Sequence, residues 1–138
     1  MIRSIVPSDE KPASSARAAQ YADGWTLGGG TPDALAESRG KLLDAWRAAG
    51  RDGEPRTMAL FYFSLGDDGE RVARESLSDY YAFLGGYADQ IVQSAAKDED
   101  TLRSYLSGFE QAGADEVICF PASPDPEQVD LLARAVGR

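Results

Sequence analysis

The sequence predicts an α/β fold, in the form of half a (β/α)8 TIM barrel with about four parallel strands and flanking helices. Short apolar runs alternate with amphipathic stretches along the 138 residues, a pattern typical of repeated βα units. The run TMALFYFSL, residues 57–65, is apolar almost throughout, as in a strand that is covered on both faces. Four such units equal half of a barrel that needs about 250 residues when complete. We therefore expect one domain over residues 1–138, a truncated (β/α) barrel.

The first unit is expected to be a short strand followed by an alanine-rich helix. The apolar run at residues 2–6 suits a strand, and the segment SDEKP, residues 8–12, forms the turn after it. Pro12 fits the first position of a helix, because its missing N–H would have no helical partner there. Residues 13–22 continue this helix, since they are rich in alanine, the strongest helix former.

The second unit combines a weak strand with a clearly marked helix. Residues 24–27 form the strand, and three glycines, residues 28–30, follow it directly. Thr31 is the predicted N-cap of the next helix, with Pro32 at its first position. One face of this helix is apolar and is made by Leu35, Leu42, Leu43 and Trp46.

The third unit has the strongest strand and the longest connection. After the strand at residues 57–65, the pattern predicts a helical region over residues 70–93, broken or bent at Gly85 and Gly86. A second helix begins near Asp100. Four tyrosines are expected on helical packing faces: Tyr80, Tyr81, Tyr87 and Tyr105.

The fourth unit is compact. Residues 116–120 form a strand, and the loop PASPDP leads into the last helix. Asp125 is the predicted N-cap of that helix, and Gln128 stands where a capping box needs it. The residues expected to face the sheet are Val129, Leu132, Ala133 and Val136.

The composition excludes several kinds of site. The chain has no histidine, which removes the Ser-His-Asp triad, the Cys-His pair and histidine-bound zinc. Cys119 is the only cysteine, so no intramolecular disulfide can form, and its apolar neighbours indicate a buried, inert thiol. The net charge of −9 opposes nucleic acid and anionic membranes. We assign no catalytic residue and no metal site, and without a secretory signal or long apolar window we expect a cytoplasmic protein.

Two positions near the second strand favour structural roles. Asp23 precedes the strand and is expected to cap a turn at its entrance, although a ligand carboxylate stays an alternative. Trp25 is expected to lie in the core, because the strand is otherwise too weak to be stable.

Three segments resemble the luciferase-like monooxygenase family, whose (β/α) barrels bind FMN or a deazaflavin. They are ARAAQYADGW at residues 16–25, TPDALAESRGKLLDAWRAAGRD at residues 31–52, and QAGADEVICFPASPDPEQVDLLARAV at residues 111–136. Their order and spacing fit the C-terminal half of such an enzyme, barrel strands five to eight. The resemblance implies an oxidoreductase or monooxygenase fold with FMN or a deazaflavin as cofactor.

The resemblance also implies where a cofactor would bind. Gly28, Gly29 and Gly30 lie between a strand and a helix N-terminus, where backbone N–H groups can hold a phosphate, yet the same glycines suit a turn with positive φ. Ser64 and Ser123 follow the third and fourth strands and would lie at the ligand face, although each also suits a loop hydroxyl.

The loop at residues 8–12 departs from the family. Members carry a small glycine-rich phosphate loop there, whereas this chain has Asp9 and Glu10, whose charges oppose a phosphate. Lys11 offsets part of that charge.

Two functions of different class follow from these observations. In the first, the chain is a flavin- or deazaflavin-dependent oxidoreductase domain, which we expect to be inactive as an isolated half barrel. In the second, it is a non-catalytic scaffold or assembly protein of the same origin, which binds no cofactor. Because a half barrel exposes two sheet edges and one face, we expect a homodimer, or else a complex with another protein.

Overall fold

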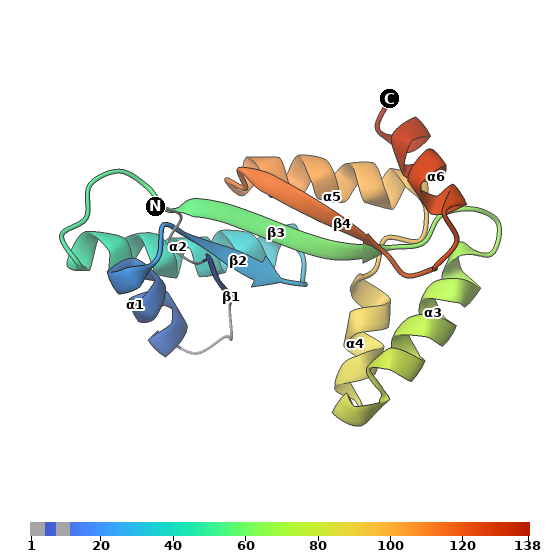
Figure 1. Ribbon diagram of the computed structural model, residues 1–138, viewed down its shortest axis with the longest axis horizontal. Helices are drawn as coiled ribbons and strands as arrows, with labels where there is room; N and C mark the ends of the chain where they lie inside the picture. The colour runs from blue at the N-terminus through green and yellow to red at the C-terminus, as the bar shows by residue number, and fades with distance from the viewer. Residues whose placement is uncertain (1–4, 8–11) are drawn as a thin grey trace. The chain divides into compact units, whose positions relative to one another are not determined.

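The computed structural model describes residues 5–7 and 12–138 and has an α/β fold (Figure 1). Its elements in chain order are β1 (Ile5–Pro7), α1 (Pro12–Tyr21), β2 (Gly24–Gly28), α2 (Pro32–Ala48), β3 (Arg56–Phe63), α3 (Gly69–Tyr80), the 3₁₀ helix η1 (Ala82–Leu84), α4 (Tyr87–Ser94), α5 (Glu99–Gln111), β4 (Glu116–Pro121) and α6 (Glu127–Ala135). The alternation of strands and helices predicted from the sequence is therefore confirmed.

The strands form a sheet in the order β1-β2-β3-β4. Strand β1 pairs with β2 in parallel, and β2 pairs with β3 in parallel from Gly24 opposite Arg56 to Gly28 opposite Leu60. The parallel α/β architecture confirms the predicted fold class, whereas its equivalence to half a barrel stays a prediction. Residues 2–4 of the predicted first strand lie outside the described residues.

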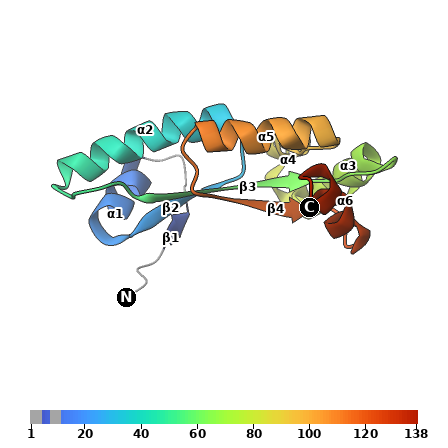
Figure 2. The same ribbon diagram turned by 90° about the horizontal axis from the view of Figure 1, so that it is seen from above.

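The chain forms two compact units. The first contains the described residues up to Leu60 together with Gly108–Ile118, and the second contains Phe61–Ser107 together with Cys119–Arg138. In the first unit α1 packs against α2 (Figure 2). In the second unit α3 and α4 lie side by side and form a helical hairpin (Figure 1).

The core of the first unit is built from the residues that the apolar pattern singled out. Trp25 is 1% exposed, as predicted. Helix α2 buries Leu35, Leu42 and Trp46 on one face. The Thr31 hydroxyl caps α2 by accepting the Ala34 N–H at 3.4 Å, so the predicted N-cap is confirmed.

Asp23 has a structural role at the entrance of β2. Its carbonyl accepts the Arg56 N–H at 3.1 Å, and its carboxylate lies 3.9 Å from the Arg51 guanidinium. Arg51 also donates to the carbonyls of Ala19 and Ala22 at the end of α1, and its guanidinium stacks 3.6 Å from the centre of the Trp46 ring. These contacts join α1, β2 and α2.

In the second unit, side chains of β3 alternate between two environments. Phe61 and Phe63 are buried, and the Phe61 ring meets the Tyr105 ring at 5.5 Å. Tyr62 packs against a second cluster, made by Ala73, Leu77 and Ala95. Gly85 and Gly86 lie at the turn of the hairpin, between η1 and α4, so the predicted helix break is confirmed.

Two expectations about packing faces are wrong. Tyr80 and Tyr87 lie at the tip of the hairpin and are 69% and 55% exposed. Val129 and Val136 of α6 are also exposed, because this helix buries Gln128 and Ala135 instead. The polar Gln128 takes the central buried position, and this shifts the buried face of the helix away from its valines.

Candidate functional site

The glycine loop, Gly28–Gly30, connects the end of β2 to the start of α2. Gly29 and Gly30 have φ angles of 99° and 110°, which L side chains rarely adopt. A Cβ placed on Gly28 or Gly29 would meet nothing within 4 Å. The loop therefore needs two of its glycines for their backbone conformation. A Cβ on Gly30 would contact the side chains of Leu27 and Ala34, at 3.5 Å and 3.6 Å.

The backbone of the glycine loop offers donors to an anion. Within residues 12–138, no hydrogen bond of the loop involves the amide of Gly29 or Gly30. The loop leads into the N-terminus of α2, which carries about half a unit of positive charge. Asp33 in the first turn of α2 reduces this field. The loop thus fits a phosphate through its backbone, with no cationic side chain in its sequence.

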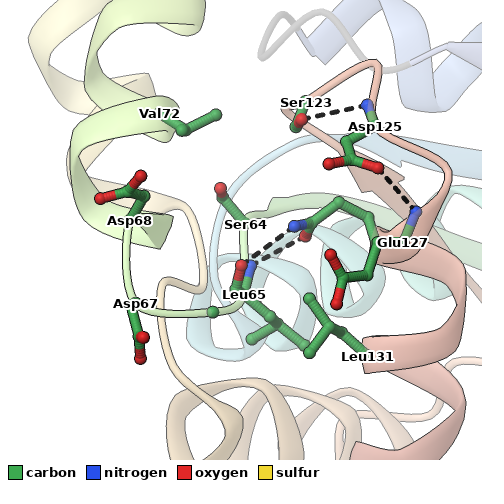
Figure 3. Close-up of a pocket in the computed structure, with 11 residues that line it drawn as sticks. Ser64, Leu65, Asp67, Asp68, Val72, Ser123, Asp125, Glu127 and Leu131 are labelled. Carbon is green, nitrogen blue, oxygen red and sulfur yellow. Dashed lines mark hydrogen bonds between the residues drawn. The ribbon is translucent and has the colours of Figure 1, made fainter.

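A second candidate site is an acidic pocket of about 470 Å³ in the second unit (Figure 3). It lies between the end of β3, the start of α3, the β4–α6 loop and α6. Its lining residues are Ser64, Leu65, Gly66, Asp67, Asp68, Val72, Ser123, Asp125, Glu127, Gln128 and Leu131.

Gln128 joins two walls of the acidic pocket. Its side-chain Oε1 accepts the Leu65 N–H and its Nε2 donates to the Leu65 carbonyl, both at 2.9 Å (Figure 3). Gln128 as a residue is 7% exposed. Its side-chain amide binds both backbone groups of Leu65, as the backbone of a neighbouring strand would, so these buried groups are satisfied. The predicted capping box is therefore wrong, since Gln128 fixes α6 to the end of β3 instead.

The β4–α6 loop is held by a chain of local hydrogen bonds. The Ser123 hydroxyl accepts the Asp125 N–H at 3.1 Å, and Asp125 Oδ1 accepts the Glu127 N–H at 2.9 Å (Figure 3). The prediction that Asp125 is the N-cap of the last helix is therefore wrong, because Pro126 holds that position and α6 begins at Glu127. Asp125 instead accepts the N–H of the first helical residue from one position further back. The Glu127 N–H could otherwise donate to a bound anion, but it already donates to the Asp125 carboxylate.

Ser64 is the unusual residue of the acidic pocket. Its side chain is completely buried, and its hydroxyl has no hydrogen-bond partner among the described residues. A buried polar group without a partner costs about 1–3 kcal/mol. Its oxygen points into the space between Val72 and Ser123 (Figure 3). The hydroxyl is available to a ligand in the pocket.

The charge of the acidic pocket does not fit an anionic cofactor group. Four carboxylates line it, those of Asp67, Asp68, Asp125 and Glu127, and no cationic side chain is among its lining residues. The nearby Arg71 pairs with Asp68 at 3.0 Å and with Glu75 at 2.9 Å. A phosphate in this pocket would meet repulsion from several like charges.

The structure brings together only some of the predicted site residues. Ser64 and Ser123 line one pocket, whereas Gly28, Gly29 and Gly30 belong to the first unit. Asp9, Glu10 and Lys11 lie outside the described residues. Asp67, Asp68 and Glu127 were not predicted from the sequence as site residues, and Asp125 and Gln128 were assigned only to helix capping. The place of the aspartates in the loops that follow β3 and β4 could have indicated them.

Two titratable groups of the second unit have raised pKa values. The hydroxyls of Tyr62 and Tyr81 lie 2.7 Å apart, and burial together with this hydrogen bond raises the pKa of Tyr81 to about 12. Cys119 is half-buried, and burial raises the pKa of its thiol. Both groups therefore keep their protons near neutral pH.

Comparison with known sequences decides the family. Residues 9–119 match the luciferase-like monooxygenase family. The chain belongs to this family. The match covers the glycine loop and β3, and it ends within β4. No curated protein matches the chain.

Solved structures with a similar fold include two F420-dependent enzymes and a flavoprotein. An F420-dependent secondary alcohol dehydrogenase in complex with an F420-acetone adduct is 18% identical, with a TM-score of 0.70, and the match covers 91% of this chain and 46% of that chain. The coenzyme F420-dependent tetrahydromethanopterin reductase from Methanopyrus kandleri is 19% identical, with a TM-score of 0.62, over 92% and 47%. Flavoprotein 390 is 22% identical, with a TM-score of 0.55, over 92% and 63%.

These identities show the fold alone. The chain spans about half the length of the two F420-dependent enzymes. Among the helices in the described part of the chain, none is both long and apolar enough to span a membrane.

Proposed function

We propose that the chain is a flavin- or deazaflavin-binding domain of an oxidoreductase in the luciferase-like family. Its family match and the F420-dependent enzymes among its structural neighbours support this proposal. The bound FMN or deazaflavin would supply hydride or oxygen chemistry, while the protein provides binding and orientation.

The glycine loop carries the proposal. It follows the carboxyl end of a parallel strand, where ligands bind in α/β folds. Its amides at Gly29 and Gly30 make no hydrogen bond within residues 12–138, and a Cβ added to Gly29 would meet no atom within 4 Å. In this proposal these amides donate to the phosphate of the cofactor.

The contact of Ser64 and Ser123 with a cofactor stays a prediction. The carboxylates beside them oppose an anionic group, so any such contact would involve uncharged atoms of the cofactor. We therefore leave both serines out of the proposed phosphate site.

A second candidate function is that of a non-catalytic assembly protein of the same family. The charge of the acidic pocket favours this alternative, because it opposes an anionic cofactor. In either case we propose that the chain pairs with a second copy. Met58 and Leu60 on one face of β3 are only half-buried, and the sheet order leaves β1 and β4 at its edges. Light scattering that shows a monomer at micromolar concentration would contradict the pairing.

Cofactor titration tests the proposed function. FMN and F420 are added separately to the purified protein, and the quenching of their fluorescence is followed. We expect saturable binding of at least one of them. No binding at high micromolar concentration of either cofactor would favour the assembly protein.

A pair of variants locates the phosphate. A Cβ on Gly28 would have no neighbour within 4 Å, and this glycine lacks a positive φ, so Gly28→Asp adds a charge without strain. We expect this variant to weaken cofactor binding about fivefold or more, through like-charge repulsion at about 4 Å. Gly40→Asp adds the same charge on open surface of α2 and should bind like the parent. Equal binding by both variants would remove the phosphate from the glycine loop.

A further inference from the structure

The acidic pocket lies at the N-termini of α3 and α6 and is nevertheless negative. Each helix N-terminus supplies about half a unit of positive charge, so the two ends together supply about one unit. Four carboxylates exceed this. Asp68 shares the Arg71 guanidinium, whereas within residues 12–138 no ion pair involves Asp67, Asp125 or Glu127. The balance of charge favours a cation over an anion.

Helix-start carboxylates alone do not explain the pocket, since acidic residues often cap helices. The second observation is the buried hydroxyl of Ser64, which has no partner among the described residues and points into the same space (Figure 3). Because this hydroxyl has no partner among the described residues, it does not cap a helix there. A ligand that donates a hydrogen bond would satisfy it together with the carboxylates.

Part of the wall of the acidic pocket is apolar, so a ligand there needs an apolar part as well. Val72 of α3 and Leu131 of α6 line it beside the polar groups. A volume of about 470 Å³ lies within the range of small-molecule sites. The pocket therefore suits a compact ligand with a cationic end and an aliphatic part.

A bare metal ion fits the pocket less well. Among residues 5–7 and 12–138, no group of three or more acidic, cysteine or histidine side chains is arranged to hold a metal ion. The carboxylates are distributed around the pocket, and an ammonium group can reach several acceptors through its three N–H donors.

We propose that the acidic pocket binds a protonated primary amine with a short aliphatic chain. The ammonium group donates hydrogen bonds to the Ser64 hydroxyl and to the carboxylates of Asp125 and Glu127. The aliphatic chain packs against Val72 and Leu131. All of these residues belong to the second unit, whereas the glycine loop belongs to the first.

Amide NMR of the intact chain tests the proposal with three small probes. n-Butylammonium should shift the amides of Leu65, Gly66 and Asp125 in a saturable way at millimolar concentration. n-Butanol has the same chain without charge and should bind about tenfold more weakly or worse, because it lacks the charge-assisted hydrogen bonds. Inorganic phosphate should leave these amides unshifted. Equal shifts with butanol, saturable shifts with phosphate, or no shift with butylammonium up to tens of millimolar would each overturn the proposal.

Three variants separate the groups of the site. Ser64→Ala removes the hydroxyl and should weaken butylammonium binding severalfold. Asp125→Asn combined with Glu127→Gln removes two charges and should weaken it about tenfold. Asp130→Asn changes an acidic residue of α6 that does not line the pocket, and it should bind like the parent. Amide spectra identify any variant that fails to fold. Undiminished binding in folded Ser64→Ala and in the folded double variant would place the amine elsewhere.

Discussion

The glycine loop and the acidic pocket both follow the carboxyl ends of strands, yet they offer opposite chemistry. The loop has no side chains and presents backbone N–H groups. The pocket presents four carboxylates and a buried hydroxyl. The two βα connections therefore differ in charge, although both follow the carboxyl end of a strand.

The difference arises from what occupies each helix start. In the pocket, Asp125 accepts the Glu127 N–H, so an internal carboxylate fills the position that an external anion would take. At α2 the Thr31 hydroxyl caps the helix without adding charge, and the three residues before it are glycines, which carry no side-chain charge. A neutral hydroxyl at the start of α2 and a carboxylate at the start of α6 therefore give the two sites different electrostatic character.

The largest expected effect on stability comes from a substitution in the acidic pocket, at Gln128. Gln128→Leu removes the two hydrogen bonds that join α6 to Leu65 and leaves buried backbone groups without partners. We expect the free energy of unfolding to fall by about 2–4 kcal/mol in urea denaturation. Gln93→Leu, on an exposed position of α4, should change it by about 0.5 kcal/mol or less. Equal stability of the two variants would show that Gln128 does not hold the pocket together.

A smaller effect is expected on the glycine-loop side. Gly30→Ala forces a side chain into a φ of 110°, which should cost about 1–2 kcal/mol. Gly28→Ala meets open space at an ordinary φ and should cost about 0.5 kcal/mol or less. Thermal unfolding of the two variants measures the contrast. If both lost the same stability, the positive φ would not be the reason for glycine at position 30.

The smallest expected effect on stability concerns Asp98, a carboxylate at the start of α5 that lies outside the acidic pocket. Asp98 precedes α5 and accepts the Thr101 N–H at 2.7 Å and the Thr101 hydroxyl at 2.8 Å. These hydrogen bonds, the backbone one first, lower the pKa of Asp98. Because the folded pKa is below the unfolded one, the stabilisation exists above the unfolded pKa and is lost as the pH falls through the folded pKa.

Asp98→Ala should therefore cost about 1 kcal/mol at neutral pH, the usual value of an N-cap. The difference from the parent should shrink as the pH falls below about 4. Asp100→Ala removes only an exposed ion pair with Arg103 and serves as the control. A difference that does not change with pH would rule out the charged form of Asp98 as the source of the stability.

Much of the fold could be predicted because its signals are local. Thr31 and Pro32 mark the start of α2, as the N-cap and the first helical residue. Gly85 and Gly86 mark the turn of the hairpin. The valines of α6 were placed on the wrong face, because a long-range contact from Gln128 to Leu65 sets its orientation. Helical periodicity does not contain that contact.

The candidate site was less predictable for the same reason. Ser64 and Ser123 could be placed at the ends of strands, and they do line one pocket. The charge of that pocket depends on Asp67 and Glu127, which lie 60 residues apart by their numbering and meet only through the fold. The isolation of the Ser64 hydroxyl depends on the packing around it and has no signal in the sequence.

Amide NMR during an FMN titration tests the central claim most directly, since FMN carries a phosphate and reports on both sites in one sample. We predict saturable shifts at residues 28–31, with the amides of Leu65, Gly66 and Asp125 unchanged. Shifts concentrated on the amides of the acidic pocket, with the glycine loop unchanged, would contradict it.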